Sequence, residues 1–233
     1  MTEALPAVLV PGLNCSPRLY AEQIPALWRF GAVMVADHIR DDTLPAIARR
    51  ILAAAPPRFA LAGLSMGGYI SFEIMRQAPQ RVAKLALLDT GARAETPEQT
   101  KMRLPRIELA RQGRMVEVAD SLFSLLVHRD RGGDEALKRL VRNMAEETGA
   151  AAFLRQQRAI MARPDSRPGL AAISCPTLVL VGDSDEATPP GLSREIAAGI
   201  RGSRLVVVAQ CGHLSTIERP EAVTGALVEW LQA

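Results

Sequence analysis

Short stretches of uninterrupted hydrophobic residues recur along the chain. A strand exposed on one face alternates hydrophobic and polar residues, whereas a strand of a parallel sheet is buried on both faces and reads as a continuous hydrophobic run. The pattern therefore predicts the strands of a mostly parallel sheet at residues 7–10, 32–36, 59–63, 85–89, 177–182 and 204–209.

Helix-like segments separate most of these runs. In the segment 43–54, Thr43 can cap the first turn, and Pro45 lies where a helix tolerates proline. Further helices are predicted at 66–78, 190–200 and 220–231. Because alternating strands and helices form right-handed crossovers that cover both faces of a sheet, the sequence predicts the α/β class.

The alternation stops between Gly91 and about residue 169, where no strand pattern is found. Hydrophobic residues recur there at helical spacing, in two groups: Val118, Leu122, Leu125 and Leu126, then Leu137, Leu140, Val141 and Met144. Neither edge of the interval has a Ser/Gly linker. We therefore predict one domain, with a core formed by residues 1–90 and 170–233 and a helical insertion at 91–169.

Composition and charge argue against several classes of function. The net charge of +3 is mildly basic, and no run of about five or more like charges indicates a nucleic-acid or membrane-binding patch. No hydrophobic stretch reaches the ~18 residues that cross a membrane, and the segment MTEALPAVLV lacks the pattern of a signal peptide. Cys15, Cys175 and Cys211 lie far apart without metal-ligand spacing, so we expect reduced thiols and a cytoplasmic protein.

The stretch GLSMGG, residues 63–68, concentrates glycine around one serine at the junction of a predicted strand and helix. A serine on so tight a turn takes strained backbone angles, and the flanking segments approach so closely that glycine fits best. The turn lifts the Ser65 hydroxyl above the carboxyl ends of the strands and directs a helix N-terminus at it. A Gly-x-Ser-x-Gly match arises by chance in ~5–10% of chains of this length, but its position between strand and helix makes Ser65 a strong candidate nucleophile.

A serine nucleophile needs a base, and the base needs an orienting acid. His213 follows the last predicted strand, so it would lie at the same sheet edge as Ser65, whereas His38 precedes the serine and His128 lies in the insertion. His213 is therefore the predicted base, and a histidine that merely caps the final helix is the plainer alternative.

The acid should follow another strand at this edge of the sheet. The segment GDSDEATPP, which begins at the end of the strand at 177–182, offers Asp183, Asp185 and Glu186. Acidic residues before a Pro-rich helix start are often simple caps. Asp185 is the preferred acid, and Asp183 is its main competitor.

Ser65, Asp185 and His213 occur in an order that, together with the serine turn, resembles the α/β-hydrolase superfamily from about residue 6 to the C-terminus. GLSMGG looks like the nucleophile elbow of that family, GDSDEATPP is similar to its Gly-x-x-Asp acid loop, and GHLSTIERPEAV looks like its histidine loop and final helix. The acid loop favours Asp185 over Asp183. The insertion occupies the position of the family's cap, and capped small-molecule esterases and carbon–carbon bond hydrolases are the most similar branch.

The resemblance also implies an oxyanion hole made by two backbone N–H groups, those of Leu13 and Met66. The family's His-Gly after its third strand is replaced here by Pro11 and Gly12, which removes no donor from Leu13. DHIRDDT stands where the family often has a glycine-rich loop, and the family's first two strands are absent. The resemblance therefore implies a six-stranded sheet.

In function, the resemblance implies a serine hydrolase that cleaves a small carboxylic ester, thioester or lactone through an acyl-enzyme, with no metal and no organic cofactor. Carbon–carbon bond hydrolases and perhydrolases keep the same three residues, so both stay open as alternatives. A non-catalytic ligand-binding receptor of this fold also stays open. Haloalkane dehalogenases carry aspartate at the elbow, and Ser65 argues against them.

Two features of the insertion bear on the substrate. Basic residues outnumber acidic ones between residues 91 and 168 but not in the rest of the chain, so the insertion could attract anionic esters. Solvated outer faces of amphipathic helices are the plainer explanation. Five hydrophobic residues are expected to cover the substrate pocket or, alternatively, to form the core of the insertion: Leu122, Leu126, Met144, Phe153 and Met161.

Overall fold

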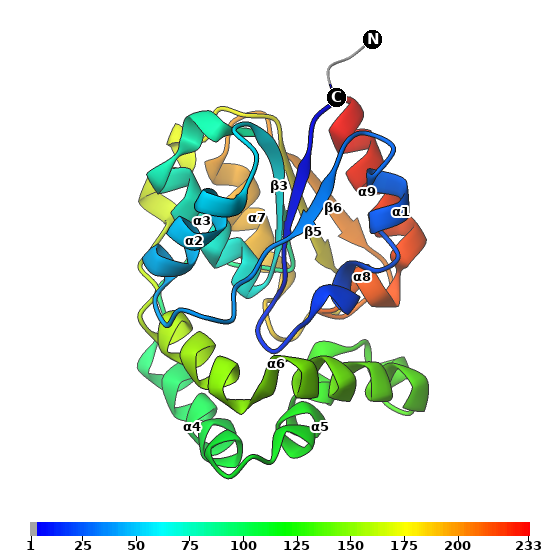
Figure 1. Cartoon of the computed structure of the whole chain (residues 1–233). Coiled ribbons are helices and arrows are strands. Elements are labelled where there is room, and N and C mark those ends of the chain that lie inside the picture. The colour runs from blue at the N-terminus through cyan, green and yellow to red at the C-terminus, as the bar shows by residue number, and fades with distance from the viewer. Residues whose placement is uncertain (1–3) are drawn as a thin grey trace.

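The computed structural model describes residues 4–233 and contains a six-stranded parallel sheet with helices on both faces (Figure 1). The strand order is β2-β1-β3-β4-β5-β6, and the strands are β1 (Ala7–Val10), β2 (Val33–Val35), β3 (Phe59–Leu64), β4 (Val82–Leu88), β5 (Thr177–Gly182) and β6 (Arg204–Val208). The predicted α/β class and the six strands are confirmed. The largest difference is in β4, which was expected at 85–89 and begins at Val82. Residues 1–3, which belong to the expected core and to the segment judged not to be a signal peptide, lie outside the described residues.

The sheet buries a separate hydrophobic cluster on each face, because successive side chains of a strand point to opposite sides. On β1, Leu9 belongs to one cluster, whereas Val8 and Val10 belong to the other. Every residue of β1, β3 and β5 is buried. This burial on both sides explains the continuous hydrophobic runs of these strands, whereas the edge strands β2 and β6 are only partly buried.

The helices divide between the two faces of the sheet (Figure 1). One face is covered by α2 (Leu44–Ala54), α3 (Met66–Gln77) and α7 (Pro190–Gly199), and the other by α1 (Ile24–Leu27), α8 (Ser215–Glu218) and α9 (Pro220–Gln232). Thr43 caps α2 as expected, since its side chain accepts a hydrogen bond from the N–H of Ala46 at 3.4 Å.

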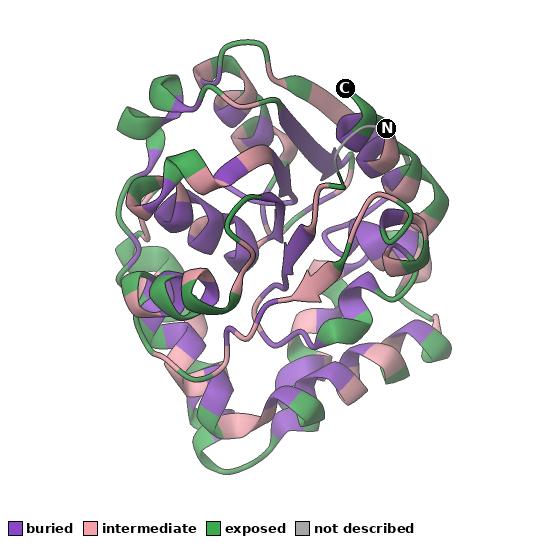
Figure 2. Cartoon of the chain, turned by 45° about the horizontal axis from the view of Figure 1, so that its top comes forward, coloured by how far each residue is buried: buried purple, intermediate pink, exposed green. Residues whose placement is uncertain are grey.

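Three helices follow β4 in the chain and precede β5: α4 (Pro97–Arg111), α5 (Met115–Leu126) and α6 (Glu135–Met161). They lie together beyond the carboxyl ends of the strands (Figure 1). The backbone of α6 is not helical at Gly149, where φ is 75°, so the element consists of two helices joined at a kink. Figure 2 shows buried and exposed residues alternating around these helices, whereas the central strands are almost wholly buried.

Three further observations concern the cysteines, membrane-spanning helices and metal-ligating side chains. Cys15, Cys175 and Cys211 are free thiols. Within residues 4–233, no helix combines the length and the hydrophobicity that crossing a membrane requires. The same residues contain no group of three or more His, Cys, Asp or Glu side chains arranged to hold a metal ion.

Candidate active site

Ser65 occupies the turn between β3 and α3 with a φ of 55°, which lies in the left-handed region that residues other than glycine rarely adopt. Its N–H donates to the C=O of Leu88 at 2.9 Å. Its C=O accepts from the hydroxyl of Thr90 at 2.8 Å and from the N–H of Gly68 at 2.9 Å. These bonds hold the strained backbone on both sides of the serine.

Two glycines of the turn lie so close to neighbouring backbone that no larger residue fits in their place. A Cβ atom at Gly63 would lie 2.3 Å from the C=O oxygen of Gly67, and one at Gly67 would lie 2.0 Å from the C=O oxygen of Val10. The first turn of α3 therefore packs directly against the backbone of β1 and β3. This packing presents Ser65 at the carboxyl edge of the sheet.

His213 and Asp185 form a buried pair on two loops that leave neighbouring strands, β6 and β5. The Nδ1 atom of His213 lies 2.8 Å from Oδ2 of Asp185, and the two residues are 3% and 2% exposed. Oδ1 of Asp185 accepts from the N–H groups of Ala187 (2.9 Å) and Thr188 (2.8 Å), and Oδ2 accepts from the Thr188 hydroxyl at 2.8 Å. The carboxylate is therefore held by its own loop, independently of the histidine.

The surroundings raise the pKa of His213. Burial disfavours the charged ring, but the negative charge of Asp185 and its hydrogen bond, with weaker effects of Asp89 and Glu218, together outweigh burial. Because Nδ1 faces a carboxylate, the neutral ring carries its proton on Nδ1. Nε2 is left as the proton acceptor.

Ser65 and His213 line the same cavity, which has a volume of about 360 Å³. Gly12 and Leu13 line it from the loop after β1, and side chains of α4 and α5 line it from the insertion. The volume suits a small molecule. Asp185 stands behind His213 and does not line this cavity.

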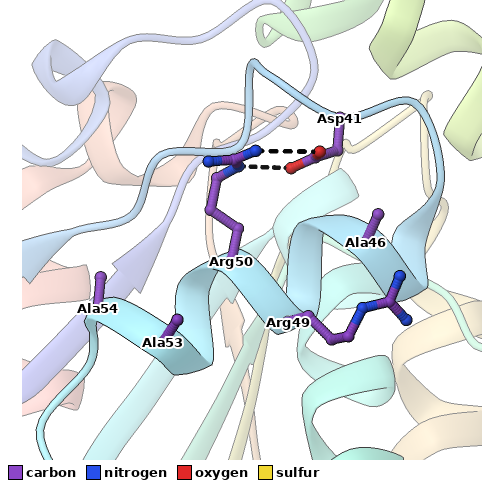
Figure 3. A pocket seen from close by; sticks show the side chains of 6 residues that line it. All are labelled: Asp41, Ala46, Arg49, Arg50, Ala53 and Ala54. Carbon is purple, nitrogen blue, oxygen red and sulfur yellow. Dashed lines mark hydrogen bonds and ion pairs between the residues drawn. The ribbon is translucent and has the colours of Figure 1, made fainter.

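A larger hollow of about 550 Å³ lies on the outer side of α2, away from these residues (Figure 3). It is lined by alanines and by three charged residues. Arg50 pairs with Asp41 at 2.5 Å, and Arg49 points away from that pair. The hollow contains no candidate nucleophile or base, so the cavity beside Ser65 is the candidate active site.

Two N–H groups are expected to face an oxyanion, that of Leu13 in the loop after β1 and that of Met66 at the start of α3. Among residues 4–233, the N–H groups of Leu13 and Met66 have no hydrogen-bond partner. Nε2 of the buried His38 lies 3.0 Å from the C=O oxygen of Gly12. This C=O shares a planar peptide unit with the N–H of Leu13, so His38 fixes the orientation of that N–H.

The five hydrophobic residues expected at the pocket separate into three groups. Leu122 and Leu126 line the 360 Å³ cavity, and Met144 lines a separate hollow of about 10 Å³. Phe153 and Met161 line neither. Phe153 is fully buried in the hydrophobic cluster shared by the insertion and the sheet, which takes its side chain away from the cavity.

Asp89, which the sequence marked only as the end of a strand, is fully buried against Gly182 and Ser215, close to the loops that carry Asp185 and His213. Its backbone has a φ of 44°. Oδ1 accepts from the N–H of Gly182 at 3.0 Å, and Oδ2 accepts from the hydroxyl of Ser215. Burial, followed by the charge of Asp185, raises the pKa of Asp89 well above its usual range. The signal in the sequence is a lone carboxylate that closes the hydrophobic run LALLD.

The loop that carries His213 is bonded to the end of α5. The C=O of Leu126 accepts from the N–H of His213 at 3.0 Å and from the next N–H at 3.1 Å. The carboxylate of Glu218 accepts from the N–H of His128 at 2.8 Å and from that of Gly212 at 2.9 Å. The position of the histidine therefore depends on the insertion as well as on β6.

Comparison with known proteins identifies the family. Residues 7–226 match the model of the alpha/beta hydrolase family, and the chain belongs to this family. The thermophilic esterase from Thermogutta terrifontis, solved with malate bound, is 30% identical and has a TM-score of 0.88, with 98% of this chain and 89% of that chain covered.

Two further relatives have related activities. The enol-lactonase from Burkholderia xenovorans LB400 is 27% identical with a TM-score of 0.89, covering 99% of this chain and 92% of that chain. The pimeloyl-[acyl-carrier protein] methyl ester esterase of Neisseria meningitidis serogroup B is 26% identical over 214 residues, which are 86% of this chain and 81% of the relative. The chain is therefore an enzyme of the hydrolase class, which removes the non-catalytic receptor from the alternatives.

Proposed function

We propose that this enzyme is a serine esterase that cleaves a small carboxylic ester, thioester or lactone, with Ser65 as nucleophile, His213 as base and Asp185 as the orienting acid. The observation that carries the proposal is the buried His213–Asp185 pair, 2.8 Å apart, whose histidine lines the same cavity as Ser65. The esterase and enol-lactonase relatives support this class of substrate.

In the proposed reaction, Nε2 of His213 takes the proton of the Ser65 hydroxyl while the serine oxygen attacks the carbonyl carbon. The oxyanion that forms accepts hydrogen bonds from the N–H groups of Leu13 and Met66, and the N-terminus of α3 favours its charge. The protonated His213 then gives its proton to the leaving alcohol, which leaves an acyl-serine. Water activated by His213 releases the carboxylic acid and restores the serine.

We further propose that the insertion, residues 91–169, acts as a cap that selects the substrate. This role is supported by the contribution of α4 and α5 to the cavity lining, with Met102 from one helix and Leu122 and Leu126 from the other. Such side chains would enclose the acyl group and exclude water from the acyl-enzyme.

A fluorophosphonate probe tests the proposal, because it reacts only with an activated serine. We expect one adduct on the peptide that contains Ser65 and parallel loss of p-nitrophenyl acetate hydrolysis. An adduct on another serine, or full labelling without loss of activity, would contradict the proposal. A second experiment offers thioesters, lactones and β-diketones as substrates, and the β-diketones test for carbon–carbon cleavage. Peroxide in place of water as the acyl acceptor tests for perhydrolysis.

The pH dependence of kcat/KM should reflect His213. The base must be unprotonated, and the pKa of His213 is raised from 6.5, so activity should fall as the pH drops through a midpoint above 6.5. The profile of kcat/KM reports the free enzyme and is measured between about pH 5 and pH 9 with p-nitrophenyl acetate, corrected for spontaneous hydrolysis. A midpoint at or below 6.5 would mean that Asp185 does not control the base.

His38→Leu is expected to lower kcat by about tenfold with little change in KM, a fraction of the ~10²–10³ that follows loss of an oxyanion-hole donor. Burial lowers the pKa of His38, so the ring is neutral and donates from Nε2 to Gly12. His38→Gln keeps a donor and should recover much of kcat. Equal kcat values in the leucine variant and the wild type would show that His38 does not position the Leu13 N–H.

A further inference from the structure

Two arginines of α4, Arg103 and Arg106, line the cavity that contains Ser65. They are three residues apart, so their side chains leave the same side of the helix. Leu122, Leu125 and Leu126 of α5 line the same cavity. The cavity thus combines a nucleophile, a hydrophobic wall and two guanidinium groups.

The charge of Arg103 is only partly balanced within the protein. Its Nε lies 2.7 Å from Glu95, whose side chain is only 4% exposed. Glu95 also pairs with the buried Arg163. Because two guanidinium groups share one carboxylate, this cluster keeps a net positive charge.

Arg106 is bonded only to neutral acceptors. Its guanidinium donates to the C=O of Met102 at 3.0 Å, to the hydroxyl of Ser121 at 3.3 Å and to the C=O of Ser121 at 3.4 Å. Within residues 4–233, no carboxylate lies at ion-pair distance from it. Partial burial and the nearby Arg103 lower the pKa of Arg106, although the group stays charged. A bound anion would offset both effects.

Glu186 is the acidic residue of the cavity lining. It is exposed to solvent, so its charge is screened more strongly than those of the partly buried arginines. The cavity therefore favours an anion on the side formed by α4.

We propose that Arg106, supported by Arg103, binds a carboxylate of the substrate, so that the preferred substrate is a small ester with a second, ionised carboxylate several carbons from the scissile carbonyl. The methylene groups between the two ends would pack on the α5 leucines. The products are then a short dicarboxylate and an alcohol. This inference rests on the proposed esterase function and adds the substrate class.

The first test compares monomethyl adipate with methyl hexanoate, which has a methyl group in place of the ionised carboxylate. We expect the wild type to prefer the anionic ester by about tenfold or more in kcat/KM, because a hydrogen bond to a charged group contributes more than a neutral one. Arg106→Gln should reduce this preference by ~10- to 100-fold, mainly through KM. Arg111→Gln, at an exposed position on the same helix, is the control and should keep the wild-type preference.

Charge reversal provides a gain of function that a structural role would not produce. Arg106→Glu should favour methyl 6-aminohexanoate, which is cationic, over monomethyl adipate. A wild type without preference for the anionic ester, or an Arg106→Gln variant that loses activity equally on both esters, would overturn the inference while leaving the esterase proposal intact.

A binding measurement tests the proposed anion site independently of ester hydrolysis. In the Ser65→Ala background, calorimetry measures the Kd for monomethyl adipate. We expect the added Arg106→Gln substitution to raise this Kd by ~10- to 100-fold. If no ester is hydrolysed but this difference holds, the esterase proposal fails and the anion site stands. If monomethyl adipate binds equally to both proteins, the anion site is wrong.

Discussion

Ser65→Ala is expected to abolish ester hydrolysis, with kcat lowered by ~10⁶-fold as recorded for removal of a serine-protease nucleophile. The variant should stay folded, because the Ser65 hydroxyl makes no hydrogen bond within residues 4–233 and the strained turn is held by backbone contacts. Turnover of p-nitrophenyl butyrate and the melting temperature are measured together.

Ser184→Ala is the matched control for this variant. Ser184 lies in the acid loop, and its hydroxyl donates to Asp183 at 2.9 Å without contacting the His213–Asp185 pair, so activity should stay near the wild-type value. A second purification column excludes a contaminating esterase, which would not co-purify with the variant. If the folded Ser65→Ala protein still hydrolyses the ester at the wild-type rate, Ser65 is not the nucleophile.

Asp185→Asn should lower kcat by ~10⁴-fold, whereas Asp183→Asn should lower it by no more than about tenfold. The asparagine C=O would accept from the N–H groups of Ala187 and Thr188, which now donate to Oδ1. Its NH₂ would then face Nδ1 of His213 and favour the tautomer with the proton on Nε2, which cannot accept the serine proton.

Asp183 has a different task in the structure. Its carboxylate accepts from the N–H groups of Gln210 at 2.9 Å and Cys211 at 3.2 Å, so it braces the loop that leads to His213. Its replacement should affect the melting temperature more than the chemical step. The decisive measurement is the ratio of the two kcat values, and the reverse ranking would transfer the role of the acid to Asp183.

The sequence predicted the central strands well because burial on both faces leaves a continuous hydrophobic run. Strand ends were less accurate. Lys84 interrupts the run of β4, yet its ammonium group reaches the C=O groups of Trp230 (3.1 Å) and Leu231 (2.8 Å), so the strand continues through a charged residue. A contact so distant in sequence leaves no local pattern.

The structure brings together the serine, the acid and the histidine that the sequence singled out, because each follows a parallel strand and these strands end at one edge. The cavity wall was less predictable. Helical periodicity identifies the side of a helix that is buried but not the surface that buries it, so Met144 and Phe153 resembled pocket residues as much as Leu122 did. The basic excess of the insertion hinted at anionic substrates but did not single out Arg106, because an unpaired charge is defined only by its neighbours in space.

The bonds from the Leu126 C=O and the Glu218 carboxylate to the histidine loop limit how this enzyme can be recombined with others. The insertion looks exchangeable along the chain, since it leaves after β4 and returns before β5. Yet a chimera that received a foreign insertion would keep these bonds only if its backbone placed a C=O beside the N–H of His213 and an N–H beside the carboxylate of Glu218. Donor and recipient must therefore match at the end of α5, and a successful exchange of specificity would transfer residues 97–125 while keeping the native 126–128.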